Sequence, residues 1–200
     1  MSNKSSAPLL VADAIASKVI ETPIEAAASS GWSAAAMLDF LSWETMEEAL
    51  GARQAHIIYS RIWEKMAQAG LPFVLADLGM TDKKDFDMKD IEKIATRFWA
   101  VVCCPYETVE TTEDTHIGEV SYCPYWEHMR MIYGEDRAKD MVKKGMGATT
   151  SNYYQAIIKA LGKWDEIYVT QDRCMCLGDE KCRLVFKKRD SKFKGMTENI

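Results

Sequence analysis

Three cysteines gather around one turn near the end of the chain, in the stretch CMCLGDEKC at residues 174–182. The residues before it, 167–170, are β-branched or aromatic, and those after it, 182–187, alternate between two faces. This pattern predicts a β-hairpin, in which Gly178 can adopt the positive φ that such turns need. A hairpin that brings thiols together can hold a soft metal, form a disulfide or line a reactive pocket, and the sequence leaves these three outcomes open.

A second hairpin is predicted earlier in the chain, where a short polar connection, 113–115, separates two strand-like segments. Together the two hairpins give four expected strands, at 106–113, 116–122, 166–173 and 181–187. A helical block lies between the hairpins and further helices precede them. This order predicts an α+β fold, with an antiparallel sheet of two hairpins, helices packed on it and an N-terminal helical extension.

The helices are predicted from apolar spacing and from capping residues. One or two helices are expected over 8–36, broken at Thr22-Pro23 and near Ser30-Gly31, and a long helix over 44–68 is expected to end at Gly70. Asp87 is expected to cap a helix that ends before Pro105. Three more are expected at 125–133, 135–144 and 151–161. We therefore divide the chain into a tail with a helical extension (1–43), an α+β domain (44–188) and a charged tail (189–200).

Composition argues against two classes of partner. The chain has 25 basic and 30 acidic residues, a net charge of −5, and no basic stripe interleaved with aromatic residues, so we expect no nucleic acid partner. No apolar run approaches the roughly 20 residues that a membrane span needs. The first residues make a poor signal peptide, so we expect a cytoplasmic protein whose six cysteines are reduced.

The stretch CLGDEKCRLVF, residues 176–186, resembles the ending of the 4-vinyl reductase-type small-molecule-binding domains. The chain is also similar to the L-2-amino-thiazoline-4-carboxylic acid hydrolase-like family, whose members carry a Cys-Pro after the preceding strand, here Cys123-Pro124. The likeness spans about residues 44–188. It implies an α+β fold with an antiparallel sheet, commonly a dimer, and a buried pocket for a small organic ligand.

The resemblance also bears on zinc. Phenol-sensing relatives hold zinc with two cysteines at the spacing of Cys174 and Cys182, together with a Glu and a further Cys. This chain departs from that set, because the residue three before Cys174 is Gln171 and residues 145–154 contain no cysteine. A soft metal, zinc being the candidate, could still bind Cys174, Cys176 and Cys182, joined by Cys123 or a histidine. The alternative is that these thiols simply pack beneath the hairpin.

Cys123 is the candidate catalytic thiol. It is expected where a strand ends and a helix begins, and helix N-terminal amides favour a thiolate there. Such a thiolate could attack a C=N or C=O carbon, with His116 or His128 moving protons. The alternative is a core cysteine. In the neighbouring pair Cys103-Cys104, at most one thiol is expected to face a pocket.

An aromatic cavity is predicted beside this thiol, because aromatic and Met side chains suit flat apolar ligands. Its expected lining is Trp99, Tyr125, Trp126, Met129, Tyr153 and Tyr154. The same residues at helical spacing could instead be core. Asp179 is expected only to cap its own turn.

Two functions fit this pattern. The first is a hydrolase-like enzyme that cleaves a ring C–N or C–S bond of a small cyclic or aromatic compound. The second is a non-catalytic domain that binds or senses a small aromatic or tetrapyrrole-like molecule. A homodimer is expected in both cases, since the helices around residues 24–41 have little polar surface.

Overall fold

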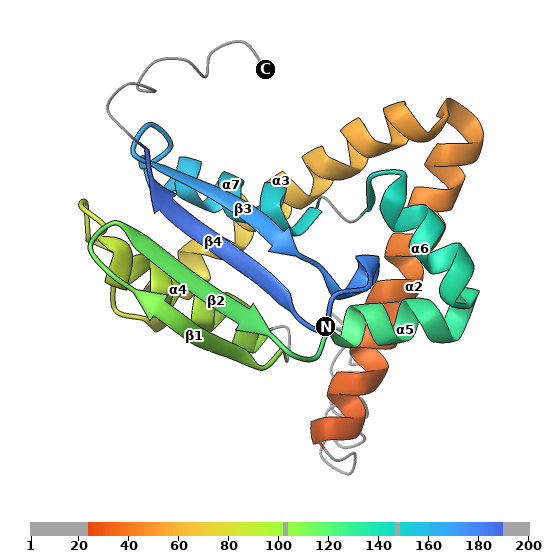
Figure 1. Cartoon of the computed structure of the whole chain (residues 1–200), viewed down its shortest axis with the longest axis horizontal. Coiled ribbons are helices and arrows are strands. Elements are labelled where there is room, and N and C mark those ends of the chain that lie inside the picture. The colour runs from red at the N-terminus through yellow and green to blue at the C-terminus, as the bar shows by residue number, and fades with distance from the viewer. Residues whose placement is uncertain (1–23, 102–103, 147–148, 190–200) are drawn as a thin grey trace, which may run out of the picture.

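The computed structural model describes residues 24–101, 104–146 and 149–189 (Figure 1). The helices are α2 (Ile24–Leu50), α3 (Ala52–Asp77), α4 (Met88–Val101), α5 (Pro124–Tyr133), α6 (Glu135–Lys143) and α7 (Thr149–Ala160). The strands are β1 (Tyr106–Thr111), β2 (Thr115–Val120), β3 (Ile167–Arg173) and β4 (Cys182–Lys188), and a short 3-10 helix, η2 (Met175–Leu177), lies between the last two. The α+β fold with its N-terminal helical portion is confirmed.

The sheet is antiparallel throughout and has the order β1-β2-β4-β3. Each hairpin supplies two neighbouring strands, and the hairpins join where β2 pairs with β4, with Gly118 opposite Leu184 and Val120 opposite Cys182. The expected strands are confirmed, with ends displaced by no more than two residues. This register brings the end of β2 beside the cysteine-rich turn.

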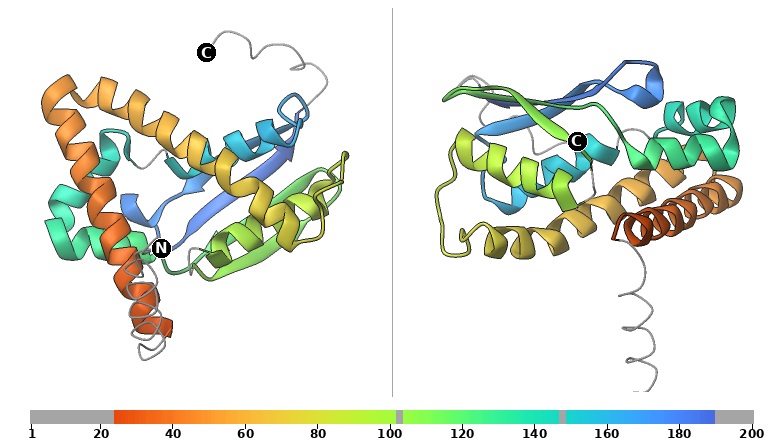
Figure 2. Two further views of the ribbon diagram at one scale, coloured as in Figure 1. Left: turned by 180° about the vertical axis from the view of Figure 1, so that it is seen from behind. Right: turned by 90° about the horizontal axis from the view of Figure 1, so that it is seen from below.

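Two helical groups flank the sheet. Helices α4 and α7 contact its strands directly, and α3 packs on both of them, so that these helices cover one face (Figure 2, right). Helices α2, α5 and α6 lie beyond the end of the sheet (Figure 1). A large apolar core fills the space between the sheet and its helices, and a second core joins α2, α3, α5 and α6. Between these cores lies a small cluster of Cys104, Val120, Cys174 and Cys182.

The expected helix over 44–68 is wrong in its bounds. The chain forms two helices that meet at Gly51, whose φ of 80° interrupts the helical backbone. The expected break near Ser30-Gly31 is also wrong, because α2 runs through it. Gly70 does not end α3, which continues past Pro72 to Asp77. A Cβ at Gly70 would lie 3.4 Å from the Phe98 ring of α4, an ordinary contact, so neither the helix nor its packing requires glycine here.

Other helix ends agree with the sequence. The Asp90 N–H donates to Asp87 Oδ1 (2.9 Å) and the Asp87 N–H donates to Asp90 Oδ2 (3.0 Å), so Asp87 caps α4 as expected. The expectations for residues 1–23, for Cys103 and for 190–200 lie outside the described residues. Among the helices of the described ranges, none combines the length and the apolar character needed to cross a bilayer. The division that we expected between residues 43 and 44 falls within α2.

Candidate functional site

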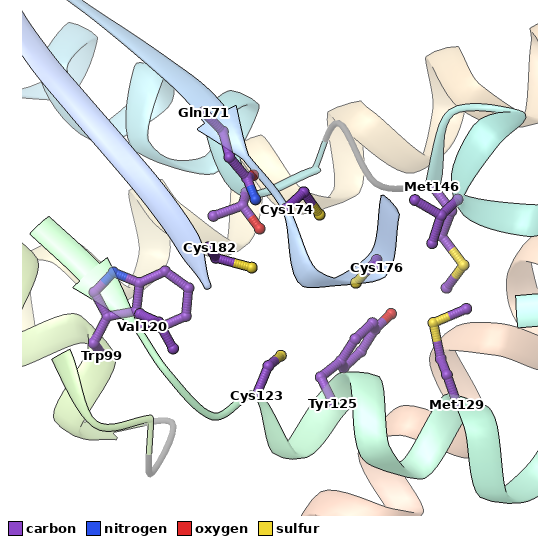
Figure 3. A pocket seen from close by; sticks show the side chains of 12 residues that line it. Trp99, Val120, Cys123, Tyr125, Met129, Met146, Gln171, Cys174, Cys176 and Cys182 are labelled. Carbon is purple, nitrogen blue, oxygen red and sulfur yellow. The ribbon is translucent and has the colours of Figure 1, made fainter. Parts of the chain in front are cut away.

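A cavity of about 50 Å³ lies where the end of β2, the start of β4 and η2 meet the second helical group (Figure 3). Its walls come from the sheet end and from α4, α5, α6 and α7. The lining residues are Trp99, Val120, Cys123, Tyr125, Met129, Val142, Met146, Thr150, Gln171, Cys174, Cys176 and Cys182. Four thiols therefore face one small space, and three of the residues expected to line an aromatic cavity, Trp99, Tyr125 and Met129, lie beside them.

The local chain geometry explains why these thiols converge. Cys182 begins β4 opposite Val120, and three residues after Val120 the chain reaches Cys123 at the start of α5. The turn of η2 then folds Cys174 and Cys176 back toward Cys182. Gly178 closes η2 with φ 110°, and the Cys174 N–H donates to Asp179 Oδ2 (2.7 Å). The positive φ at Gly178 and the capping role of Asp179 are both confirmed.

Cys123 is the N-cap residue of α5, where its Sγ accepts the Trp126 N–H at 3.5 Å. A hydrogen bond from the Cys104 thiol and this backbone N–H lower the pKa of Cys123, against the opposing effect of burial. The environment thus favours the thiolate form, as the position before Pro124 suggested.

Cys174 is the strongest thiolate candidate of the cluster. The thiols of Cys176 and Cys182 donate hydrogen bonds to it, and together with backbone N–H groups they lower its pKa to about 3, although burial opposes the charge. The same hydrogen bonds raise the pKa of Cys176 and of Cys182, since those two thiols must keep their protons to donate them. The Cys182 sulfur accepts the Met175 N–H at 3.3 Å. The environment therefore favours a thiolate at Cys174, with two thiols as its donors.

This arrangement bears on zinc binding. Thiolates are suitable ligands for zinc, and four thiols line the cavity. However, within the three described ranges no group of three or more His, Cys, Asp or Glu side chains is positioned to hold a metal ion. As the side chains stand, the sulfur atoms hydrogen-bond to one another rather than form a tetrahedral site. Zinc binding by Cys174, Cys176 and Cys182 stays a prediction, and we derive no chemistry from it.

Neither candidate base lines the cavity. His116 is fully buried in the sheet core, where Nε2 contacts Tyr106 Oη (2.7 Å), Nδ1 contacts Thr111 Oγ1 (2.9 Å) and the ring packs on Phe186. His128 lies on α5, and its Nδ1 is 2.5 Å from the Pro124 carbonyl oxygen, to which it donates. The structure therefore does not bring either histidine into the cavity that Cys123 lines.

The remaining aromatic candidates pack in the cores rather than around the cavity. Trp126 is buried in the core of the second helical group, and Tyr154 is buried against Phe186 under the sheet. Tyr153 stacks edge-on with Trp63 and Phe98. These residues support the walls without lining the cavity.

Sequence reasoning missed a polar network behind the cavity. The hydroxyl groups of Tyr59, on α3, and Tyr125, on α5, both donate to Asp39 Oδ2, on α2, and lie 2.7 Å from each other. Burial raises the pKa of Asp39 to about 6, partly offset by the hydrogen bond from Tyr59. The available signal was Asp39 itself, a single acid in the apolar stretch AAAMLDFLSW at residues 34–43.

Comparison with known proteins supports the fold and not a family. No family model matches the chain, and no curated protein matches it. Subunit 3 of the trafficking protein particle complex from Naegleria fowleri, in a crystal structure covalently bound to palmitic acid, is similar with a TM-score of 0.58 and 14% identity, over 80% of this chain and 96% of that one. The phenol-responsive sensory domain of the transcription activator PoxR, in a crystal structure with phenol, has a TM-score of 0.49 and 15% identity, over 76% of this chain and 73% of that one. The families that the sequence resembles stay predictions.

Proposed function

We propose that this protein binds a small organic molecule in the thiol-lined cavity, as a binding or sensory domain and without turnover. The observation that carries the proposal is the composition of the wall, in which Trp99, Tyr125 and Met129 face four cysteine sulfur atoms. Aromatic rings and sulfur are polarisable and suit a flat apolar ligand. The Naegleria subunit, which shares the fold, holds palmitic acid, so this fold is able to accommodate a small ligand.

The size of the cavity narrows the ligand class. About 50 Å³ holds a few water molecules, whereas a cavity that accepts benzene measures about 150 Å³. Binding a single ring therefore requires side chains to move, and Met129 and Met146, which are unbranched and flexible, are the suitable ones. A tetrapyrrole would need far more space, so we favour a ligand with one ring.

Calorimetric titration with phenol tests this proposal. We expect the unmodified protein to bind phenol and Cys176→Trp, which fills the cavity, to bind it at least tenfold more weakly. The matched control is Leu177→Trp, because Leu177 neighbours Cys176 in η2 but is 58% exposed and does not line the cavity. Equal binding by both variants would contradict the cavity as the binding site. Native mass spectrometry of freshly purified protein would show a co-purified ligand directly.

A second candidate function is hydrolysis of a ring C–N or C–S bond, with Cys123 as nucleophile. The observation in its favour is the lowered pKa of Cys123 at the start of α5. Because neither His116 nor His128 lines the cavity, the proton would have to come from another thiol or from water. If a substrate is found, Cys123→Ala should lose orders of magnitude in turnover and keep its affinity. Unchanged turnover would remove Cys123 from the mechanism.

We also propose that the chain forms a homodimer through α2 and α3. Both helices expose large apolar side chains, among them Leu38 (69% exposed) and Leu41 on α2, and Met66 and Phe73 (78%) on α3. Exposed apolar groups of this size and number are typical of interaction surfaces. Light scattering should report about twice the chain mass of 22.6 kDa, and Phe73→Lys should lower the measured mass. A single species of 22.6 kDa at micromolar concentration would overturn this proposal.

A reducing compartment, such as the cytoplasm, suits these thiols. In the described part of the chain the cysteines are thiols and not disulfides: Cys104, Cys123, Cys174, Cys176 and Cys182. Neighbouring thiols of this kind would oxidise readily outside such a compartment. Fractionation of cells that produce the protein would test this proposal.

A further inference from the structure

The network of Asp39, Tyr59 and Tyr125 connects the cavity to three helices. Tyr125 belongs to both, since it lines the cavity and its hydroxyl group donates to Asp39. Figure 3 shows the Tyr125 ring rising from α5 toward η2, with its hydroxyl oxygen, in this view, between the side chains of Cys176 and Met129. Phe40 and Trp63 contact the ring edge-on and hold it in place. The hydroxyl oxygen is therefore a fixed polar atom on the wall.

Counting protons shows what this oxygen can offer a ligand. When Asp39 is ionised, the hydroxyl protons of Tyr59 and Tyr125 both go to its Oδ2. When Asp39 is protonated, the network has three protons, one each from Asp39, Tyr59 and Tyr125. The three oxygen atoms lie within hydrogen-bond distance of one another, so each proton is again donated within the network. In both states the Tyr125 proton is committed, and only a lone pair remains for a ligand.

The sulfur side of the cavity has the same character. The thiols of Cys176 and Cys182 donate to Cys174, so their protons are used within the cluster and the sulfur atoms present lone pairs. The amide of Gln171, also on the wall, donates through Nε2 to the Arg173 carbonyl (3.2 Å). The sulfur atoms thus add acceptors to the lone pair of Tyr125, and one of the two amide protons of Gln171 is already used.

We propose that Asp39 is a positioning residue that makes the Tyr125 hydroxyl an acceptor, so that the cavity selects molecules carrying an O–H or N–H donor over equally large molecules with acceptors alone. This inference rests on the proposed binding function and specifies its ligand class. Tyr125 is the residue that determines this specificity, because its oxygen meets the ligand.

Two isomers with the same atoms provide the test. The phenol p-cresol carries an O–H donor, whereas its isomer anisole, a methyl ether, has only an acceptor. In calorimetric titrations, we expect the unmodified protein to bind p-cresol about tenfold more tightly than anisole, which is the effect of one net hydrogen bond. In Tyr125→Phe this ratio should fall below about two. In Asp39→Leu only the bond between the two tyrosine hydroxyl groups remains, in which either can be the donor, so the Tyr125 proton is available to a ligand and the ratio should fall.

The matched control is Tyr59→Phe. It removes a hydroxyl group from the same network, but Tyr59 does not line the cavity and the bond from Tyr125 to Asp39 remains, so the preference should persist. A general loss of packing would lower both affinities and leave their ratio unchanged. Thermal melts establish that each variant folds, and if Asp39→Leu does not, the two tyrosine variants decide the matter.

The outcomes separate the two proposals. If the unmodified protein binds both isomers equally, the binding function stands and the specificity inference is wrong. If Tyr125→Phe keeps the tenfold preference, Tyr125 is not the acceptor and the inference is again wrong. If neither isomer nor phenol binds, the binding function itself is overturned, and the inference falls with it.

Discussion

Two buried polar networks, each containing tyrosine, differ in whether they reach the cavity. In the sheet core, His116 has a partner for each ring nitrogen, Tyr106 and Thr111, and none of these three residues lines the thiol-lined cavity. Among the helices, Asp39 receives two hydroxyl groups, and one of these, that of Tyr125, ends on the cavity wall. The first network, which we call the closed network, makes its hydrogen bonds within the core. The second network includes a residue of the cavity wall, Tyr125, whose oxygen atom can still accept a hydrogen bond.

This difference separates a structural role from a functional one. A buried polar network in which every group is satisfied stabilises one arrangement of the core. A network that ends at a cavity can hold a ligand-contacting atom in a fixed orientation. The proton affinities differ as well, because burial lowers the pKa of His116 and so favours its neutral form, whereas burial raises the pKa of Asp39 to about 6. The networks should therefore respond differently to mutation and to pH.

The largest effect is expected at Gly118, which makes room for the closed network. A Cβ at this position would lie 1.9 Å from Tyr106 Oη, the atom that bonds to His116. Gly118→Ala must displace Tyr106 and break that hydrogen bond, so we expect it to lower the free energy of unfolding by about 3 kcal/mol. Urea unfolding measures this loss.

The control for this prediction is Gly70→Ala. Gly70 lies within α3, and a Cβ there would make an ordinary contact with Phe98 at 3.4 Å. Because alanine has the higher helix propensity, we expect this substitution to raise the free energy of unfolding by about 0.5–1 kcal/mol. Equal effects of the two substitutions would mean that the close approach at Gly118 has no energetic importance.

The next largest effect is the loss of stability when a tyrosine hydroxyl group is removed from either network. Tyr106→Phe leaves Nε2 of the fully buried His116 without its partner, so we expect a loss of about 1–3 kcal/mol in urea unfolding. Tyr125→Phe leaves Asp39 with the hydroxyl group of Tyr59, so we expect a loss below about 1 kcal/mol. If Tyr125→Phe were the more damaging change, the network among the helices would be the structural one.

Local chain chemistry was enough to predict much of this molecule. Turn residues and alternation gave the strands, and capping gave the start of α4 at Asp87. The position of Cys123 at a helix start and the capping role of Asp179 also follow from residues close in sequence. Such features depend on short-range interactions, which a single sequence displays directly.

Features that depend on tertiary approach could not be predicted in this way. Gly70 resembles a helix stop, yet α3 continues past it to Asp77, and at Gly70 the helix is packed near Phe98 of α4. His116 and Cys123 are seven residues apart, yet β2 directs His116 into the core while Cys123 lies beyond the strand end at the cavity. The contact between Asp39 and Tyr125 joins residues 86 positions apart, and no periodicity in the chain indicates it.

The pH dependence of stability should distinguish the networks next. From pH 4 to 6 the folded protein retains the Asp39 proton that the unfolded chain has released, so the contribution of Asp39 to stability falls as pH rises. His116 has the opposite sign, because the unfolded imidazole binds a proton below about pH 6.5 and the buried one resists it. Its contribution therefore rises with pH up to about 6.5.

Single variants isolate each contribution. Between pH 4 and 7, Asp39→Asn should gain stability relative to the unmodified protein by about 1–3 kcal/mol, and His116→Gln should lose stability relative to it. Urea unfolding at several pH values measures both differences. If the free energies of unfolding of both variants, plotted against pH, run parallel to that of the unmodified protein, neither group changes its proton affinity on folding.

The smallest effect is expected on the rate at which a thiol reagent modifies Cys174, one of the cysteines that line the cavity with Tyr125. Because Cys176 and Cys182 donate to Cys174, the pKa of Cys174 is held at about 3, and its thiolate should persist at pH 5.5 where an ordinary cysteine is protonated. We expect a small thiosulfonate reagent to modify Cys174 first at this pH, as mapped by peptide mass spectrometry. Cys176→Ala removes one of the two thiol donors and should slow the modification severalfold, whereas Leu177→Ala, at an exposed neighbouring position, should not. Metal analysis of the same preparation completes the measurement, since one equivalent of bound zinc would protect Cys174 and would show that the thiols rearrange around a metal.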